Sequence, residues 1–141
     1  MVRIAHTDDE IARCFEVMAE LRPHLERHEF VGLVHEMAAE GYRLAFLEAE
    51  GQVVTVAGYR VSTNLWLGRH LYVDDLVTAG DARSAGHGAQ MLDWLRMQAR
   101  AAGCRFFDLD SGTQRGGAHR FYFGKGLTIS AFHFSEPLDA P

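Results

Sequence analysis

The chain has 141 residues, of which 48% are hydrophobic and 23% are charged. This length and composition predict one globular domain with a real hydrophobic core, and they exclude a disordered chain. The net charge is −5 and no block of Lys or Arg occurs, so nucleic acid is not an expected partner.

The sequence contains neither a long apolar stretch nor paired cysteines. No apolar run approaches the roughly 18 residues of a membrane span, and Met1–His6 lacks the apolar core of a signal peptide. Cys14 and Cys104 stand alone, without the CxxC or Cys/His spacing of a metal site, and are expected to be reduced, buried thiols. We therefore expect a cytoplasmic protein with no membrane partner and no metal.

The first part of the chain predicts one strand and two helices. Val2–His6 alternates as a short strand, and Thr7–Glu10 has the sequence of a helical capping box. Apolar residues then recur at spacings of three and four, which predicts an amphipathic helix that Pro23 ends or bends. The residues of this apolar stripe are Ile11, Cys14, Phe15, Met18 and Leu21. A second helix is expected at about Glu26–Glu40, with Gly41 as its stop.

The period of the apolar residues then changes to two, which is typical of strands. Three strands are expected, at Arg43–Ala49, Gln52–Val61 and Leu71–Thr78. Glu50-Gly51 fits a tight hairpin turn, and Thr63–Arg69 is a looser connection.

The last third of the chain alternates helix and strand. The expected elements are a helix at Ala89–Ala102, a strand at Arg105–Asp110, a short helix at about Gly117–Phe123 and a last strand near Thr128–Phe134. The resulting order, β-α-α-β-β-β-α-β-α-β, predicts a mixed α/β sandwich that forms a single domain over residues 1–141.

A glycine turn, Arg83-Ser-Ala-Gly-His-Gly88, separates the third of these strands from the following helix. Such a turn is typical of phosphate binding, because glycines let the backbone approach the anion and the first free N–H groups of the helix point at it. The Walker pattern GxxxxGK[ST] is absent, and Gly86-His-Gly88 lacks the third glycine of a dinucleotide fingerprint. Both of those cofactor classes are disfavoured.

Two motifs in this order resemble a known family. The turn has the form Arg-x-x-Gly-x-Gly after the apolar Val77, and Phe121-Tyr122-x-x-Lys-Gly-Leu127 follows further along the chain. This combination resembles the GNAT superfamily of acyl-CoA-dependent N-acetyltransferases. The resemblance implies a GNAT-like fold and transfer of an acetyl group from acetyl-CoA to a primary amine of an acceptor that the sequence does not identify. A non-catalytic acyl-CoA-binding sensor or regulatory module is the alternative.

The resemblance also implies where acetyl-CoA lies. The backbone of Leu76 and Val77 should pair with the pantetheine amides like an extra strand edge, where this strand splays from the strand ending at Asp110. The pyrophosphate should rest on N–H groups of the glycine turn, and Arg83 can add a charge-assisted contact. The residues assigned to this phosphate site are Arg83, Ser84, Ala85, Gly86, His87, Gly88 and Ala89. An exposed loop arginine and a helix cap are the structural alternative for Arg83 and Ser84.

Tyr122 resembles the family tyrosine that lies near the cofactor sulfur. Acetyl transfer expels a thiolate whose thiol has a pKa of about 8.5 by analogy with cysteine, and a phenol with a pKa of about 10 can donate a proton to it. The alternative is that Tyr122 packs with Phe121 and Phe123, although a buried hydroxyl then needs a partner.

The residue that deprotonates the amine is less clearly marked. Asp110 lies where some family members carry a carboxylate credited with this step, and Asp75 on the neighbouring strand is the other candidate. An aspartate with a pKa of about 3.9 is a poor direct base, so it would act through water, after burial raises its pKa, or by binding the ammonium group. A solvated or salt-bridged carboxylate is the structural alternative. Neither cysteine lies beside the motifs, which favours direct attack over an acyl-enzyme.

The sequence departs from the family pattern near its end. Only a short segment follows Leu127 and offers one strand, where many members have two. This difference is compatible with a homodimer in which a second subunit completes the acceptor cleft. Arg115 stands in a region that lacks the asparagine often found there, which puts one family contact to the cofactor in doubt.

Overall fold

The computed structural model describes residues 1–139 and contains two compact units. The first unit runs from Met1 to Leu109, and the second begins at Asp110. All strands of the described residues belong to the first unit, so the sheet and the helices that cover it are formed by one continuous part of the chain.

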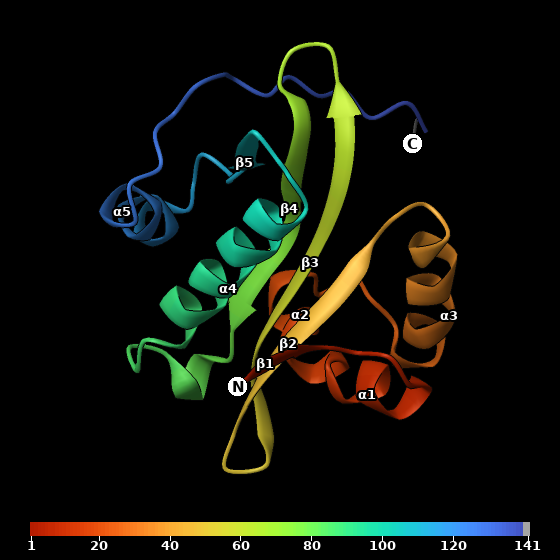
Figure 1. The fold of residues 1–141 in the computed structure, drawn as a ribbon. Helices are drawn as coiled ribbons and strands as arrows, with labels where there is room; N and C mark the ends of the chain where they lie inside the picture. Colours follow the sequence, from red (N-terminus) through yellow and green to blue (C-terminus); the bar gives the residue numbers. More distant parts are fainter. Residues whose placement is uncertain (140–141) are drawn as a thin grey trace. The chain divides into compact units, whose positions relative to one another are not determined.

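A five-stranded sheet in the order β1-β2-β3-β4-β5 is the centre of the first unit (Figure 1). The strands are β1 (Val2–Ile4), β2 (Arg43–Ala49), β3 (Gln52–Asn64), β4 (Gly68–Thr78) and β5 (Phe106–Leu109). The first four pair antiparallel, and β5 joins β4 in parallel. The mixed α/β class expected from the sequence is confirmed.

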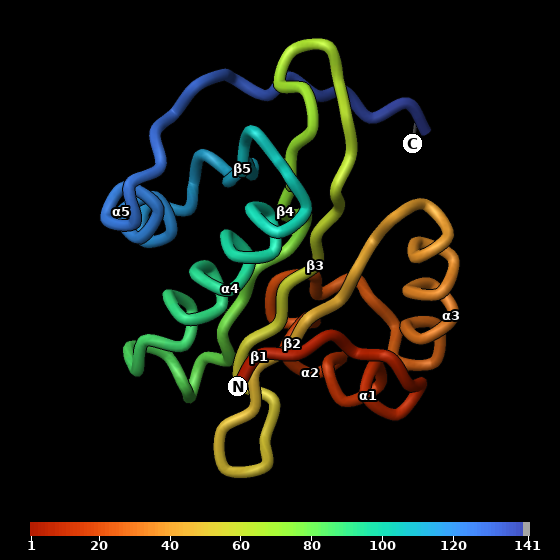
Figure 2. The backbone as a smooth tube through the Cα atoms, viewed as in Figure 1, coloured from red at the N-terminus to blue at the C-terminus, as the bar shows by residue number. Residues whose placement is uncertain are grey.

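The two hairpin connections lie at opposite ends of the sheet (Figure 2). The predicted tight turn is confirmed, since Glu50 and Gly51 have φ values of 52° and 76°, and two positive φ values match the twist of the flanking strands. The looser connection expected at Thr63–Arg69 is wrong. Most of it is strand, because Asn64 Oδ1 accepts a 2.6 Å hydrogen bond from the Leu67 amide and closes a much shorter turn.

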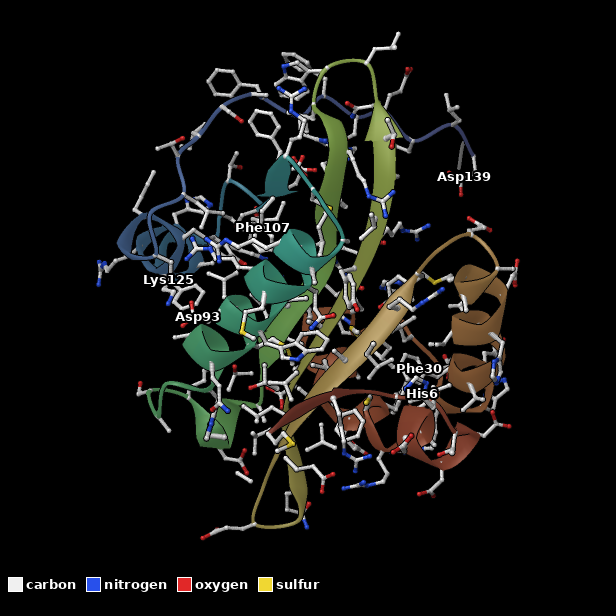
Figure 3. All side chains as sticks on the ribbon, in the orientation of Figure 1. His6, Phe30, Asp93, Phe107, Lys125 and Asp139 are labelled. Atoms are coloured by element: carbon white, nitrogen blue, oxygen red, sulfur yellow. The ribbon has the colours of Figure 1, made fainter. Side chains whose placement is uncertain are left out.

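Helices cover both faces of the sheet (Figure 1). One face carries α1 (Asp8–Arg13), α2 (Phe15–Leu21) and α3 (Arg27–Ala38), and the other carries α4 (His87–Ala101). Each face has its own core. Phe30 of α3, labelled in Figure 3, belongs to the first cluster, whereas Met91 and Leu95 of α4 belong to the second.

The first amphipathic helix is interrupted, contrary to the prediction of one helix from Ile11 to Leu21. Cys14 separates α1 from α2, and its amide bonds back to the Ile11 carbonyl at 3.0 Å, three residues earlier. The apolar spacing did not reveal the break, because α2 resumes on the same face and Cys14 is fully buried there. The capping box before the break is confirmed by reciprocal bonds between Thr7 and Glu10.

The second unit contains one helix, α5 (Gly116–Gly124). The last strand expected near Thr128–Phe134 is wrong, since these residues form no regular secondary structure. A strand needs a hydrogen-bonded neighbour, and the described part of this unit contains no other strand. Ile129 and Phe132 lie on opposite sides of the alternating pattern and are both exposed, so no single face gains from burial.

Among residues 1–139, no helix combines the length and the apolar character needed to cross a membrane.

Candidate functional site

The chain between β4 and α4 forms an exposed turn with an unusual backbone. A short 3₁₀ helix, Gly80–Ala82, follows β4, and Ser84 and Gly86 then adopt positive φ values of 70° and 83°. A Cβ atom at Gly86 would meet open space. Glycine is therefore favoured here by the left-handed backbone conformation, and not by a close contact within the protein. The surface of the turn is therefore open to a ligand.

Helix α4 begins at this turn without a capping side chain. Gly86 occupies the N-cap position and makes no side-chain hydrogen bond, and the first turn of the helix carries no acidic residue. The first N–H groups of an α-helix have no partner within the helix, and the positive end of the helix dipole lies beside them. The residues assigned to the phosphate site, Arg83–Ala89, are consecutive here and can bind an anion through their amides.

The Arg83 side chain contacts other residues of the protein in the structure and is not free to bind a phosphate. Its Nε donates to the Thr78 carbonyl at 3.3 Å, and its Nη2 lies 3.9 Å from Glu20 Oε1. Glu20, at the end of α2, also accepts a 2.9 Å hydrogen bond from the Gly80 amide. The sequence did not indicate that Glu20 fastens this turn. The Arg83 side chain is 64% exposed and would have to leave these long contacts to reach a phosphate.

The edge of β4 becomes open where β5 ends. The last parallel pair is Val73 with Leu109, although β4 continues to Thr78. Leu76 and Val77 pair with β3 on one side, and no strand of the described residues lies on their other side. An open strand edge presents backbone donors and acceptors to which an extended ligand can bind.

A β-bulge in β4 lies at the same place. Val73 is opposite Tyr59 of β3 and Asp75 is opposite Gly58, so Asp74 is an extra residue without a partner in the register. Val73 packs in the cluster beneath α4, whereas Val77 packs in the cluster on the face of α1–α3. In a regular strand these two side chains would share a face, so the bulge reverses the alternation of β4.

Five polar side chains gather at the bulge. The Tyr42 hydroxyl donates a 2.8 Å hydrogen bond to Asp75 Oδ2. Arg22 Nε donates a 3.0 Å hydrogen bond to Asp75 Oδ1 and forms an ion pair with it. Arg22 also donates to the Asp74 carbonyl at 2.9 Å, and the Asp74 carboxylate pairs with Arg60 at 3.0 Å. Burial raises the pKa of Asp74, and the ion pair with Arg60 partly opposes this rise. Burial, followed by the negative charge of Asp75, raises the pKa of Tyr42.

Asp110 directly follows β5 and opens the second unit. Phe107 (labelled in Figure 3) and Leu109 of β5 pack against the cluster beneath α4. Asp110 itself lies beyond the strand, with its Oδ2 at 3.5 Å from Nδ1 of His133. The carboxylate is 47% exposed, so water can reach it.

Tyr122 lies on α5 in the same unit as Asp110. Its ring contacts that of Phe121 edge-on, with centroids 5.4 Å apart. Burial raises the pKa of the Tyr122 phenol, and the positive charge of Arg115 partly opposes this. The phenol is therefore neutral at pH 7 and can act as a proton donor. His119 on the same helix is 2.8 Å from the Gly112 carbonyl through its Nε2.

The chain matches the sequence model of the acetyltransferase (GNAT) family over residues 6–125. It is 35% identical over 132 residues to the uncharacterized N-acetyltransferase YhdJ of Bacillus subtilis, a match that covers 92% of this chain and 93% of that protein. It is 33% identical over 101 residues to the aminoalkylphosphonate N-acetyltransferase of Salmonella typhimurium, covering 69% of this chain and 62% of that protein.

Solved structures share the fold. A transcriptional regulator from Bacillus halodurans has a TM-score of 0.85 at 20% identity, with 98% of this chain and 99% of that chain covered. The aminoglycoside N-acetyltransferase AAC(6')-Iy, solved in complex with CoA, has a TM-score of 0.85 at 11% identity, with 99% and 96% covered.

The protein therefore belongs to the acetyltransferase (GNAT) family. It is an acetyl-CoA-dependent N-acetyltransferase, and acetyl-CoA is its co-substrate. The family resemblance expected from the two motifs is confirmed.

Proposed function

We propose that this chain acts as a single N-acetyltransferase domain that transfers an acetyl group to a primary amine by direct attack in a ternary complex. The observation that carries this proposal is the continuous path from the open edge of β4 to the uncapped N-terminus of α4. The edge offers strand-like partners to an extended amide-containing arm, and the helix offers N–H groups to phosphates. One segment of the chain thus fits both the pantetheine arm and the pyrophosphate of acetyl-CoA.

In this proposal the cofactor is bound mostly by backbone. Leu76 and Val77 pair with the pantetheine amides, and the pyrophosphate accepts hydrogen bonds from N–H groups of Ser84, Ala85, Gly86, His87, Gly88 and Ala89. Arg83 adds a positive charge once it turns from Thr78 and Glu20. The positive φ values of Ser84 and Gly86 support the assignment, because left-handed residues in a turn allow successive backbone N–H groups to converge on an anion.

Tyr122 is the proposed proton donor. The amine nitrogen attacks the carbonyl carbon, the carbon–sulfur bond breaks, and the Tyr122 phenol passes its proton to the departing sulfur. The raised pKa of Tyr122 supports this role, because the residue stays protonated until the thiolate forms. Direct attack is supported by Cys14, whose thiol is buried and has its pKa raised to about 12, a state in which it is a poor nucleophile.

The base is proposed to be Asp110, acting through water. Its carboxylate is 47% exposed, so a water molecule can lie between it and an ammonium group. Asp75 is less suited, because both of its oxygens already accept hydrogen bonds, from Tyr42 and from Arg22. Asp110→Asn should therefore lower turnover more than acetyl-CoA affinity. Retention of full turnover would remove Asp110 from the mechanism.

The acceptor class is tested by CoA release from acetyl-CoA with a panel of primary amines. The panel should include aminoalkylphosphonates, because one relative is named for that substrate, together with aminoglycosides, polyamines and peptides with free N-termini or lysines. The expected result is turnover with at least one class and a product that is heavier by one acetyl group. Binding of acetyl-CoA without turnover on any amine would instead support a sensor.

A further inference from the structure

The polar cluster around the bulge is built from distant parts of the chain. Tyr42 lies directly before β2 and Arg22 directly after α2, and both side chains bond to Asp75 of β4. Arg60 of β3 neutralises the adjacent Asp74 and lies 5.5 Å from the centre of the Tyr42 ring. Two carboxylates and two guanidinium groups thus balance in charge beside one phenol.

Gly58 makes this arrangement possible. A Cβ atom at Gly58 would overlap the Tyr42 ring and its hydroxyl, so the absence of a side chain leaves the space through which Tyr42 crosses β3. Gly58 is also the β3 residue opposite Asp75 in the strand register. The Tyr42 side chain is therefore seated over the bulge itself and is only 3% exposed.

The bulge decides which backbone groups face the open edge of β4. The N–H and C=O groups of one strand residue point to one neighbouring strand, and those of the next residue point to the other. One extra residue at Asp74 exchanges these directions for Leu76 and Val77. The position of the bulge therefore determines which backbone donors and acceptors a ligand at this edge can pair with.

We propose that Tyr42 and Arg22 are positioning residues for acetyl-CoA. They act through Asp75 and hold the bulge at Asp74, which sets whether Leu76 or Val77 turns its backbone N–H and C=O groups to the open edge and so to the pantetheine arm. Arg22 donates two hydrogen bonds to the bulge, one to the Asp75 carboxylate and one to the Asp74 carbonyl. This inference rests on the proposed cofactor site.

The test is the dissociation constant of acetyl-CoA, measured by titration calorimetry for the wild type, Tyr42→Phe and Arg22→Gln. Each variant removes a bond to Asp75. The Arg22 side chain is 41% exposed, so Arg22→Gln should fold even if Tyr42→Phe, at a buried position, does not. Affinity should fall about fivefold in each, since a typical hydrogen bond no longer holds the binding-competent register. Arg22→Lys, which cannot grip both groups with one planar fork, should also weaken binding.

Tyr59→Phe is the matched control. Tyr59 lies next to Gly58 in β3, but its side chain packs in the cluster beneath α4, and the Asp74 and Asp75 carboxylates bond to Arg60, Tyr42 and Arg22 instead. This variant should bind acetyl-CoA as the wild type does. Hydrogen exchange in the peptide that contains Asp74–Val77 should accelerate in Tyr42→Phe and Arg22→Gln but not in Tyr59→Phe.

The outcomes separate the two proposals. If Tyr42→Phe and Arg22→Gln lose thermal stability but bind acetyl-CoA as tightly as the wild type, the residues have a structural role only and the inference is overturned. If the wild type and Tyr59→Phe also bind acetyl-CoA, the proposed cofactor site survives that result. Absence of binding in the wild type would contradict the proposed function itself.

Discussion

The Tyr42 hydroxyl and the Asp75 carboxylate are joined by a 2.8 Å hydrogen bond that passes over β3. The donor precedes β2 and the acceptor follows the bulge of β4, so the bond links two strands that are not neighbours in the sheet. Gly58, the β3 residue between them, leaves the space for it.

Removal of this hydroxyl should destabilise the protein. Tyr42→Phe should lower the free energy of unfolding by about 1–3 kcal/mol, because the nearly buried Asp75 carboxylate loses one of its donors. Urea denaturation followed by circular dichroism measures this quantity. Tyr59→Phe should have a smaller effect, and equal effects of the two variants would contradict the assignment.

Glu10 should contribute stability that is lost in acid. Hydrogen bonds from the His6 and Thr7 amides, followed by Arg3, lower the pKa of Glu10 from 4.5 to about 2. A lowered folded-state pKa means that the stability is present above pH 4.5 and is lost as the pH falls towards 2. The thermal midpoint of the wild type should therefore fall more over this range than that of Glu10→Gln.

Glu36→Gln removes the same charge from an exposed position of α3 and serves as the control for Glu10→Gln. Its pH dependence should follow that of the wild type. An identical acid profile for Glu10→Gln and the wild type would show that the capping box does not depend on the charge of Glu10.

The two cysteines should react differently with thiol reagents. Burial raises the pKa of Cys14 to about 12, so its thiol is neutral and shielded at pH 8. Cys104 is only half-buried. Mass spectrometry after mild alkylation should find the label on Cys104 first, and on Cys14 only after the protein is unfolded. Rapid labelling of Cys14 in the native protein would show that the α1–α2 junction opens.

Tyr122→Phe should separate chemistry from binding. The ring and its contact with Phe121 are retained, but no proton can be passed to the sulfur. We expect kcat to fall about a hundredfold, the lower end for general acid catalysis, with the acetyl-CoA dissociation constant changed less than twofold. The measurement is CoA release with the best amine of the acceptor panel. Unchanged turnover would remove Tyr122 from the mechanism, and Tyr59→Phe should stay fully active.

Local chemistry made much of the fold predictable. The capping box at Thr7–Glu10, the Glu50-Gly51 turn and the helix that follows the glycine turn are each specified by neighbouring residues, and the structure confirms them. The break at Cys14 was not predictable, because the apolar spacing continues through it. The strand expected at Thr128–Phe134 depends on a hydrogen-bonded neighbour, which no local pattern reveals.

The candidate site also has one part that was predictable from local sequence and one part that was not. The glycine turn could be recognised from Gly86 and the residues around it, whereas the bulge arises from the register between two strands. One signal of the bulge was present in the sequence, since Asp74 and Asp75 are two consecutive acids between the apolar residues Val73 and Leu76. Their partners Tyr42 and Arg22 are distant in sequence and could be found only from the fold.

We propose that acetyl-CoA binds where β4 leads into α4. Gly86→Glu tests it by placing a negative charge at the expected pyrophosphate position. Gly103→Glu is a matched control, because Gly103 lies just beyond the other end of α4, has a φ of 74° compared with 83° at Gly86, and is also surrounded by open space. Both variants should therefore carry similar backbone strain.

The most direct measurement is the dissociation constant of acetyl-CoA for these two variants beside the wild type. Gly86→Glu should abolish measurable binding, because its carboxylate repels the pyrophosphate, while Gly103→Glu should bind as the wild type does. Wild-type affinity in a folded Gly86→Glu variant would show that acetyl-CoA does not bind at this turn.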